Sequence, residues 1–70
     1  MDKKELKVEM LRHGDNGETL AEALSITNVT LSKKMNGVSD FTRKEMLQIK
    51  ERYSLSDERL FAIFFAENMS

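Results

Sequence analysis

The sequence contains no cysteine and no proline, and it has only one histidine and three glycines. The lack of cysteine excludes disulfides and thiolate metal sites, and it suits a reducing compartment. His13 alone cannot form a metal cluster, so we expect neither a metal nor a cofactor. Because proline is absent and glycine is scarce, the composition favours helices joined by short turns.

Long apolar runs are also missing. The longest, LFAIFFA at residues 60–66, falls far short of the roughly 18 residues that span a bilayer. The N-terminal stretch MDKKELKVEML lacks the continuous apolar segment of a signal peptide. We therefore expect a cytoplasmic location and no membrane partner.

The 70 residues suffice for a single domain, residues 1–70, near the lower size limit for a core without disulfides or metals. Hydrophobic residues make up 40% and charged residues 33%, which is typical of a folded chain. The net charge of −1 argues against a generally basic nucleic-acid binder. The charge is unevenly spread, however: residues 27–44 carry +3, and the segments before and after each carry −2.

Start and stop signals divide the chain into five expected helices. Asn16, Thr27, Thr42 and Ser56 are good N-cap residues, and Thr42 with Glu45 has the spacing of a capping box. Gly14 and Gly37 are suitable helix stops. The helices are expected at residues 3–13, 17–24, 28–35 and 43–52, and from residue 57 onward. The predicted fold is an all-α bundle.

Apolar residues at helical spacing predict the core. We expect it to contain Leu6, Met10, Leu20, Ala21, Leu24, Leu31, Met35, Phe41 and, in part, Met46, Leu47 and Ile49. Val8 or Leu11 should widen the apolar stripe of the first helix. In the last helix, Leu60, Phe61 and Phe64 should complete the core. Ile63 or Phe65 would then remain exposed and form the interface of a weak homodimer.

Residues 25–37, SITNVTLSKKMNG, lie in the positive segment although their helix propensity is weak. Two helices joined by a three-residue turn, LAEAL-SIT-NVTLSKKM, match a helix-turn-helix arrangement. Ala21 would let the two helices approach, and Ile26 would fill the turn. With Leu31 and Met35 facing inward, the outer face carries side chains that suit contacts with base edges: Asn28, Val29, Ser32 and Lys33.

The segment LAEALSITNVTLSKKMNG resembles the helix-turn-helix region of lambda-repressor-like proteins, the Cro/CI or XRE family. The portion MNGVSDFTRKEMLQIKERYSLSDERLFAIFF resembles small phage-encoded, Cro-sized members, so the resemblance covers nearly the whole chain. It implies a compact five-helix DNA-binding domain with the helix-turn-helix at helices two and three. The implied function is transcriptional regulation, with residues 28–35 inserted into the major groove of double-stranded operator DNA.

Carried over by position, the resemblance gives Asn28 the place of a base-reading Gln and Val29 a contact with a thymine methyl group. Lys33 lies one turn further along the groove-facing side, and Asn36 matches a phosphate-contacting Asn. The other expected phosphate contacts come from hydroxyl groups and from the cluster of positive charge: Thr27, Thr30, Lys34, Thr42, Arg43 and Lys44.

Two positions depart from the family pattern. Ser25 stands where the family usually has Gly, and a left-handed backbone there would cost roughly 1 kcal/mol relative to Gly. Gly17 replaces the Gln that opens the family's second helix. This replacement removes one expected contact to a phosphate or to the base-reading side chain.

An enzyme and a protein-interaction module are the alternatives to DNA binding. The carboxylate pairs Glu18–Glu22 and Glu5–Glu9 lack an accompanying nucleophile, phosphate loop or metal-ligand set, so we expect neither an enzyme nor a small-molecule substrate. The stronger alternative is a protein-interaction module of the same fold. Such a module would bind another regulator or a polymerase subunit through the Phe-rich last helix.

Overall fold

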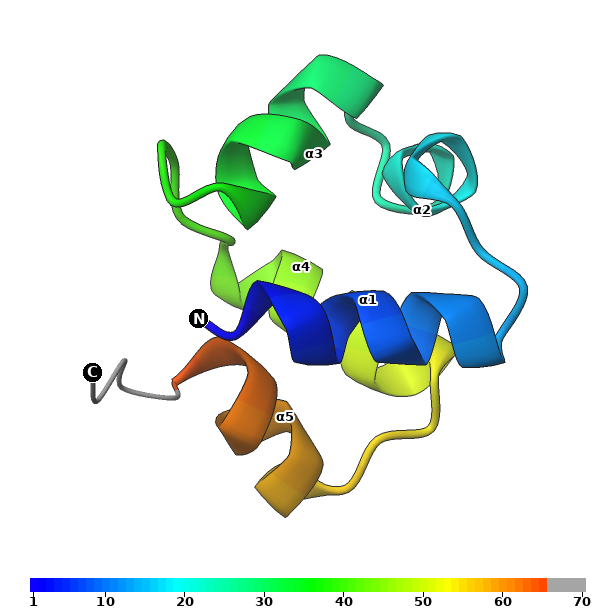
Figure 1. The fold of residues 1–70 in the computed structure, drawn as a ribbon, viewed down its shortest axis with the longest axis vertical. Coiled ribbons are helices and arrows are strands. Elements are labelled where there is room, and N and C mark those ends of the chain that lie inside the picture. Colours follow the sequence, from blue (N-terminus) through cyan, green and yellow to red (C-terminus); the bar gives the residue numbers. More distant parts are fainter. Residues whose placement is uncertain (66–70) are drawn as a thin grey trace.

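The computed structural model describes residues 1–65, which form five α-helices (Figure 1). They are α1 (Lys3–Arg12), α2 (Gly17–Ala23), α3 (Asn28–Met35), α4 (Arg43–Arg52) and α5 (Asp57–Phe64). This part of the chain contains no strand. The predicted all-α, five-helix fold is therefore confirmed, and α3 and α4 have the bounds expected from the sequence.

α1 crosses the middle of the molecule, with α2 and α3 toward one end of its longest axis and α5 toward the other (Figure 1). α2 packs against α3, and α5 packs against both α1 and α4. The Asp2 amide donates a 2.6 Å hydrogen bond to the Ile63 carbonyl, which joins the start of the chain to α5. The described residues span 30 × 26 × 21 Å. None of their helices is both long enough and apolar enough to cross a membrane.

Every helix begins at a residue whose side-chain oxygen accepts a hydrogen bond from the backbone amide three positions later. These N-cap residues are Asp2, Asn16, Thr27, Thr42 and Ser56. The capping box of Thr42 and Glu45 is present as expected, and Asn16 with Thr19 forms a second one. The helix starts are thus determined by short side chains close in sequence, which is why the sequence predicted four of them.

The first four helices all end at a residue with left-handed backbone: Gly14, Ser25, Gly37 and Ser54. At the end of α2, the Ser25 amide donates to the Glu22 carbonyl and the Ile26 amide to the Ala21 carbonyl, each at 3.0 Å. These two bonds define a Schellman motif, and the other three ends repeat it. Both glycine stops were expected. For Ser25, the sequence analysis gave the cost of a left-handed backbone if the turn required one. The left-handed backbone of Ser54 was not predicted.

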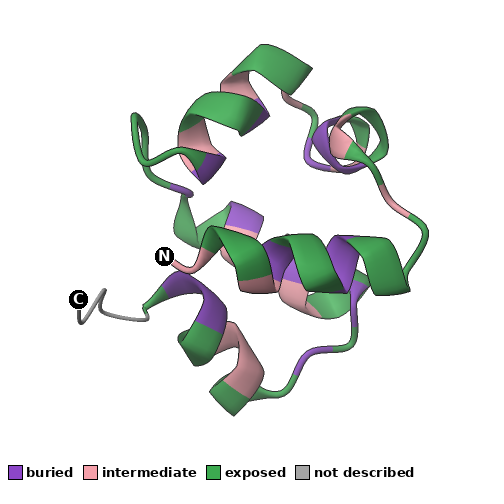
Figure 2. Ribbon diagram, in the orientation of Figure 1, coloured by how far each residue is buried: buried purple, intermediate pink, exposed green. Residues whose placement is uncertain are grey.

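The core contains every residue expected in it from the first three helices, and Phe41, together with Ile49, Tyr53, Leu55, Ile63 and Phe64; buried segments are purple in Figure 2. The expected partial burial of Leu47 was wrong, since its side chain is 49% exposed on the outer side of α4. On α1 the prediction was wrong for Val8 and Leu11, which are 37% and 81% exposed. Glu9 is buried instead, because α1 turns the face of Leu6 and Met10 inward and Glu9 meets the Arg59 guanidinium there.

The inward face of α5 also differs from the one predicted. Ile63 and Phe64 are 0% and 8% exposed, while Phe61 is 64% exposed and Leu60 is half-buried. Positions i, i+3 and i+4 share one helix face, so burial of Leu60, Ile63 and Phe64 leaves Phe61 on the outside. The expectation that Phe61 belongs to the core and that Ile63 is exposed was therefore wrong.

Asp15 joins the α1–α2 loop to the end of α4. Its carboxylate accepts hydrogen bonds from Arg52 Nε at 2.7 Å, Arg52 Nη2 at 2.8 Å and the Tyr53 hydroxyl at 2.6 Å. The Arg52 hydrogen bonds, with those of Tyr53 and Thr19, hold the pKa of Asp15 well below its ordinary value despite the opposing effect of burial. This carboxylate is therefore part of the tertiary framework.

Candidate nucleic-acid interface

The outer face of α3 is solvent-exposed along the length of the helix (Figure 2). Leu31 and Met35 are buried at 1% and 8% exposure, as the sequence predicted. The four side chains predicted to contact bases are all exposed: Asn28, Val29, Ser32 and Lys33. Val29 is 66% exposed, although a β-branched apolar side chain contributes little to a surface helix. α3 thus presents hydrogen-bonding groups, one apolar side chain and one cation to solvent.

The connection between α2 and α3 fixes how α3 is presented. Ala21 is buried at 2% exposure, and Ile26 packs against the core from the turn. Ser25 has a φ of 59°, so the left-handed geometry required by this turn is adopted by a non-glycine residue. Thr27 then caps α3. Both helices are therefore anchored by the core, and the outer face of α3 is held in a defined orientation.

Gly17, the first residue of α2, lies directly against the Asn28 side chain. A Cβ atom at Gly17 would sit 2.7 Å from Asn28 Oδ1, which is closer than real contacts allow. The absence of a side chain at position 17 therefore gives Asn28 the room to lie against the start of α2. The sequence suggested only that Gly17 removes a DNA contact. The structure shows in addition that a side chain at position 17 would displace the Asn28 amide from its present position.

Lys34 does not face outward as we expected for a phosphate contact. Its Nζ lies 3.0 Å from Glu45 Oε1 and donates a 2.9 Å hydrogen bond to the Asp40 carbonyl, and its side chain is only 10% exposed. Burial raises the pKa of Glu45, but the Thr42 amide and Lys34 outweigh it and lower the pKa overall. Lys34 is therefore a structural residue that holds α3 against the capping box of α4.

The predicted phosphate-contacting hydroxyls differ in their availability. The Thr27 hydroxyl accepts from the Thr30 amide and donates a 2.9 Å hydrogen bond to the Thr30 hydroxyl, so its proton already has an acceptor. Thr30 is half-buried. The exposed Thr42 hydroxyl accepts from the Glu45 amide, and no acceptor for its own proton is present in residues 1–65. Thr42 is thus the best placed of the three to donate to a phosphate.

Ion pairing separates the basic residues into two groups. Five form salt bridges within residues 1–65: Arg12, Lys34, Lys50, Arg52 and Arg59. The others have no acidic partner in that part of the chain: Lys3, Lys4, Lys7, Lys33, Arg43 and Lys44. The second group contains three of the four basic residues predicted to contact DNA. It also contains lysines of α1 that the sequence did not single out.

Arg43 and Lys44 are the first two residues of α4, and both are exposed. Cations are unfavourable at a helix N-terminus because the helix dipole places partial positive charge there. Helix stability therefore gives no reason for two basic residues at this end. The positive end of the helix and the two side chains together suit an anionic partner.

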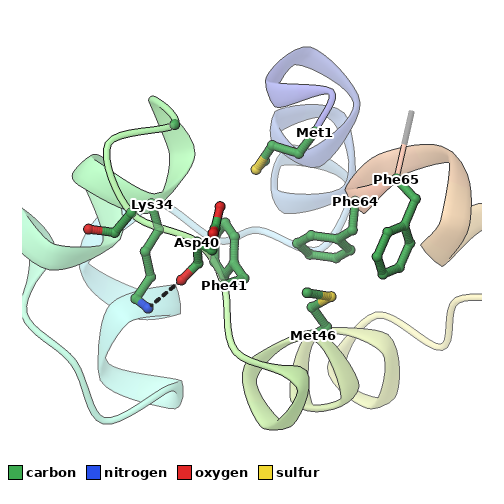
Figure 3. Close-up of a pocket in the computed structure, with 9 residues that line it drawn as sticks. Met1, Lys34, Asp40, Phe41, Met46, Phe64 and Phe65 are labelled. Carbon is green, nitrogen blue, oxygen red and sulfur yellow. Dashed lines mark hydrogen bonds between the residues drawn. The ribbon is translucent and has the colours of Figure 1, made fainter. Parts of the chain in front are cut away.

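Phe65 is exposed as predicted, but its predicted companion in a dimer interface is not. Ile63 is fully buried, whereas Phe61 and Phe65 are 64% and 51% exposed with ring centroids 5.4 Å apart. Beside them, a cavity of about 360 Å³ is bordered by Phe65, Phe64 and Met46 (Figure 3). The exposed aromatic surface at this end of the chain therefore consists of Phe61 on α5 and Phe65, the residue directly after it.

The described residues contain no group of three or more side chains placed to hold a metal ion. Glu5 and Glu9, one of the carboxylate pairs seen in the sequence, both form ion pairs with Arg59. Comparison with known proteins gives no match to a family model, to a curated protein or to a solved structure. The function of the surface is therefore inferred from its own residues and geometry.

Proposed function

We propose that this protein is a sequence-specific DNA-binding transcriptional regulator of the lambda-repressor-like class, encoded by a phage or prophage and acting in the cytoplasm. The observation that supports this most is the composition of α3. Its inner face is anchored by the buried residues Leu31 and Met35. Its outer face carries residues of weak helix propensity whose side chains suit contacts with base edges.

In the proposed mechanism α3 enters the major groove and no covalent chemistry occurs. Asn28, Val29, Ser32 and Lys33 select the sequence, with Val29 against a thymine methyl group. Thr42, Arg43, Lys44 and Asn36 contact phosphates and supply most of the affinity. Thr27 and Thr30 are secondary candidates for phosphate contacts, since their hydroxyls are hydrogen-bonded to each other. Lys34 is omitted because it is paired with Glu45.

The proposal is tested by selecting bound duplexes from a random pool and then titrating the enriched site across salt concentrations. Lys44→Ala should weaken binding and make the dependence of log K on log salt shallower by about 0.9 for each phosphate that the protein no longer neutralises. Asn28→Ala should weaken the base preference by about 1–3 kcal/mol with an unchanged slope. Lys50→Ala, which removes the same charge from a lysine paired with Asp57, is the matched control. Failure to enrich any site would contradict the proposal.

Two copies would read adjacent half-sites, and we assign their contact to Phe61 and Phe65 on α5. The two rings are exposed, with centroids 5.4 Å apart. α5 as a whole lies toward the opposite end of the molecule from α3 (Figure 1), and neither ring belongs to a residue proposed to contact DNA. A dimer formed there leaves the DNA-binding face free.

A second candidate function is binding to another regulator or to a polymerase subunit. Two observations favour it. Phe61 and Phe65 are exposed, and α2 carries the exposed carboxylates Glu18 and Glu22 beside α3. Titration with duplex DNA separates the two functions, because an interaction module of this kind would bind duplex no better than an unrelated bundle of equal charge.

A further inference from the structure

A groove between α1 and α3 lies beside the outer face of α3. Its volume is about 200 Å³, and its polar lining consists of Lys3 and Lys7 from α1 with Asn28, Ser32 and Asn36. Met10, Leu31 and Met35 contribute its apolar lining. Among residues 1–65, no carboxylate lines this groove. Two of the residues proposed to contact bases, and the Asn proposed to contact phosphate, thus share one groove with two lysines.

The charges of α1 are sorted between its two sides. Glu5 and Glu9 face α5, where Arg59 Nη1 lies 3.4 Å from Glu5 Oε1 and Arg59 Nε lies 2.7 Å from Glu9 Oε2. Lys3 and Lys7 are four positions apart, so they share the opposite side, and both are exposed. Neither has an acidic partner in residues 1–65. α1 thereby presents positive charge to the groove although the chain as a whole is slightly acidic.

Lys3 also fixes the orientation of Asn36. The Lys3 ammonium donates a hydrogen bond to Asn36 Oδ1, and Asn36 Nδ2 lies 3.4 Å from Ser32 Oγ. With its carbonyl oxygen accepting from Lys3, the amide donates one N–H to Ser32 Oγ, and its second N–H has no acceptor within residues 1–65. An ammonium group has three donors, so Lys3 keeps two N–H groups for another acceptor. The ammonium and the amide together form a donor set that an anionic oxygen can complete.

We propose that Lys3 and Lys7 form a second phosphate-binding edge of the DNA interface, in which the α1–α3 groove receives a phosphate of the strand that borders the major groove. Lys3 and Lys7 would contact the phosphate oxygens, and Lys3 would also position the Asn36 amide toward them. This inference rests on the proposed function. It adds to that function by extending the interface from α3 and α4 to α1.

The test is a salt titration of duplex binding by the full chain, with the enriched DNA site and with an unrelated duplex. Lys7→Ala should make the slope of log K against log salt shallower by about 0.9, and the Lys3→Ala, Lys7→Ala double variant by about 1.8. Lys7→Arg keeps the charge and should keep the slope. Lys4→Ala is the matched control, because Lys4 is an exposed lysine of the same helix that has no acidic partner within residues 1–65 and does not line the groove. The preference for the enriched site over the unrelated duplex should not change.

The inference is overturned if Lys7→Ala and the double variant keep the wild-type slope, or change it only as much as Lys4→Ala does. In that result Lys44→Ala still reduces the slope, so the proposed function is retained and only the α1 phosphate contact is excluded. If the wild type shows no binding above that of an unrelated bundle of equal charge, both proposals fall. Circular dichroism of each variant checks that exposed Lys3 and Lys7 are not needed for folding.

Discussion

Ser25 and Ser54 occupy equivalent backbone positions, the left-handed residues after α2 and α4, with φ of 59° and 51°. An L-residue pays roughly 1–2 kcal/mol for this conformation, and glycine pays about 0.5–1 kcal/mol in extra entropy lost on folding. Ser25→Gly and Ser54→Gly should therefore each raise the free energy of unfolding by about 0.5–1 kcal/mol. Urea denaturation of the two variants measures the change.

Gly14 and Gly37 provide the reverse control. Both have positive φ, and a Cβ atom added at either would meet no atom within 4 Å. Alanine at these positions therefore meets only the backbone cost, less the folding entropy that glycine loses, so it should lower the free energy of unfolding by about 0.5–1 kcal/mol. If the serine-to-glycine changes destabilise the protein while these alanine changes do not, backbone strain at the helix ends is not the cause.

Gly17 and Asn28 are expected to act as a unit. Gly17→Ala places a Cβ where Asn28 Oδ1 lies, so the amide must move and the base preference should fall toward that of Asn28→Ala. In an Asn28→Ala background the same Gly17→Ala change has no amide to displace and should alter DNA binding little. Binding of all four variants to the enriched site completes the cycle. Independent, additive losses would show that Gly17 does not position Asn28.

At the scale of one helix, substitution of the adjacent residues Lys33 and Lys34 of α3 should affect the stability of the protein differently. Lys34 joins α3 to the start of α4 through Glu45, with 10% of each side chain exposed, whereas Lys33 is exposed and unpaired within residues 1–65. Lys34→Ala removes a charged partner from Glu45, so it should cost about 1–3 kcal/mol of unfolding free energy. Lys33→Ala should change stability by less than about 0.5 kcal/mol. Chemical denaturation distinguishes them, and equal losses would contradict the assignment.

Asp15 links the α1–α2 loop to α4, so its titration should affect the whole fold. Its pKa is lower in the folded chain than in the unfolded one, where it is about 3.9. The stability from this depressed pKa is present above the unfolded value and is lost as the pH falls below it. Asp15→Asn should therefore reduce stability at neutral pH and flatten its decline in acid. The measurement is urea denaturation between pH 7 and pH 2.

Asp57 is the control for that measurement. Hydrogen bonding to Lys50 also lowers the pKa of Asp57, but the Asp57 side chain is 91% exposed. Exposed ion pairs contribute little because water and salt screen them. Asp57→Asn should consequently leave the acid profile close to that of the wild type. Parallel profiles for Asp15→Asn and the wild type would show that the Asp15 cluster does not govern acid stability.

The sequence predicted those elements whose determinants are local. N-cap residues and capping boxes act within four positions of the chain, and this explains the agreement for α3, α4 and the start of α5. The side of a helix that faces the core was harder to predict where apolar residues surround it. α5 illustrates this, since Phe61 and Ile63 are both apolar and only packing against α1 and α4 decides between them.

The candidate site was predicted in part for the same reason. The exposed face of α3 follows from helical spacing around Leu31 and Met35. The pairing of Lys34 with Glu45, the contact of Gly17 with Asn28 and the place of Lys3 beside Asn36 join residues from different elements. A single sequence contains no signal for such pairs, so they became visible only in the folded chain.

At the scale of the whole molecule, size limits how much DNA one copy can read. The longest dimension of the described residues is 30 Å, and successive half-sites of a palindromic operator are about 34 Å apart. Under the proposed function a single copy would therefore place one α3 in one half-site, and a full operator would require two copies. Exposed Phe61 and Phe65 provide the apolar surface proposed for their contact.

This limit gives a prediction about cooperativity. The wild type should bind a two-half-site duplex cooperatively, and Phe65→Ser should reduce that cooperativity because it removes half of the exposed aromatic pair. Affinity for a single half-site should stay unchanged, since Phe65 is not among the residues proposed to contact DNA. Equilibrium sedimentation checks the same surface without DNA. A wild type that remains monomeric at hundreds of micromolar and binds both half-sites independently would exclude dimerisation through α5.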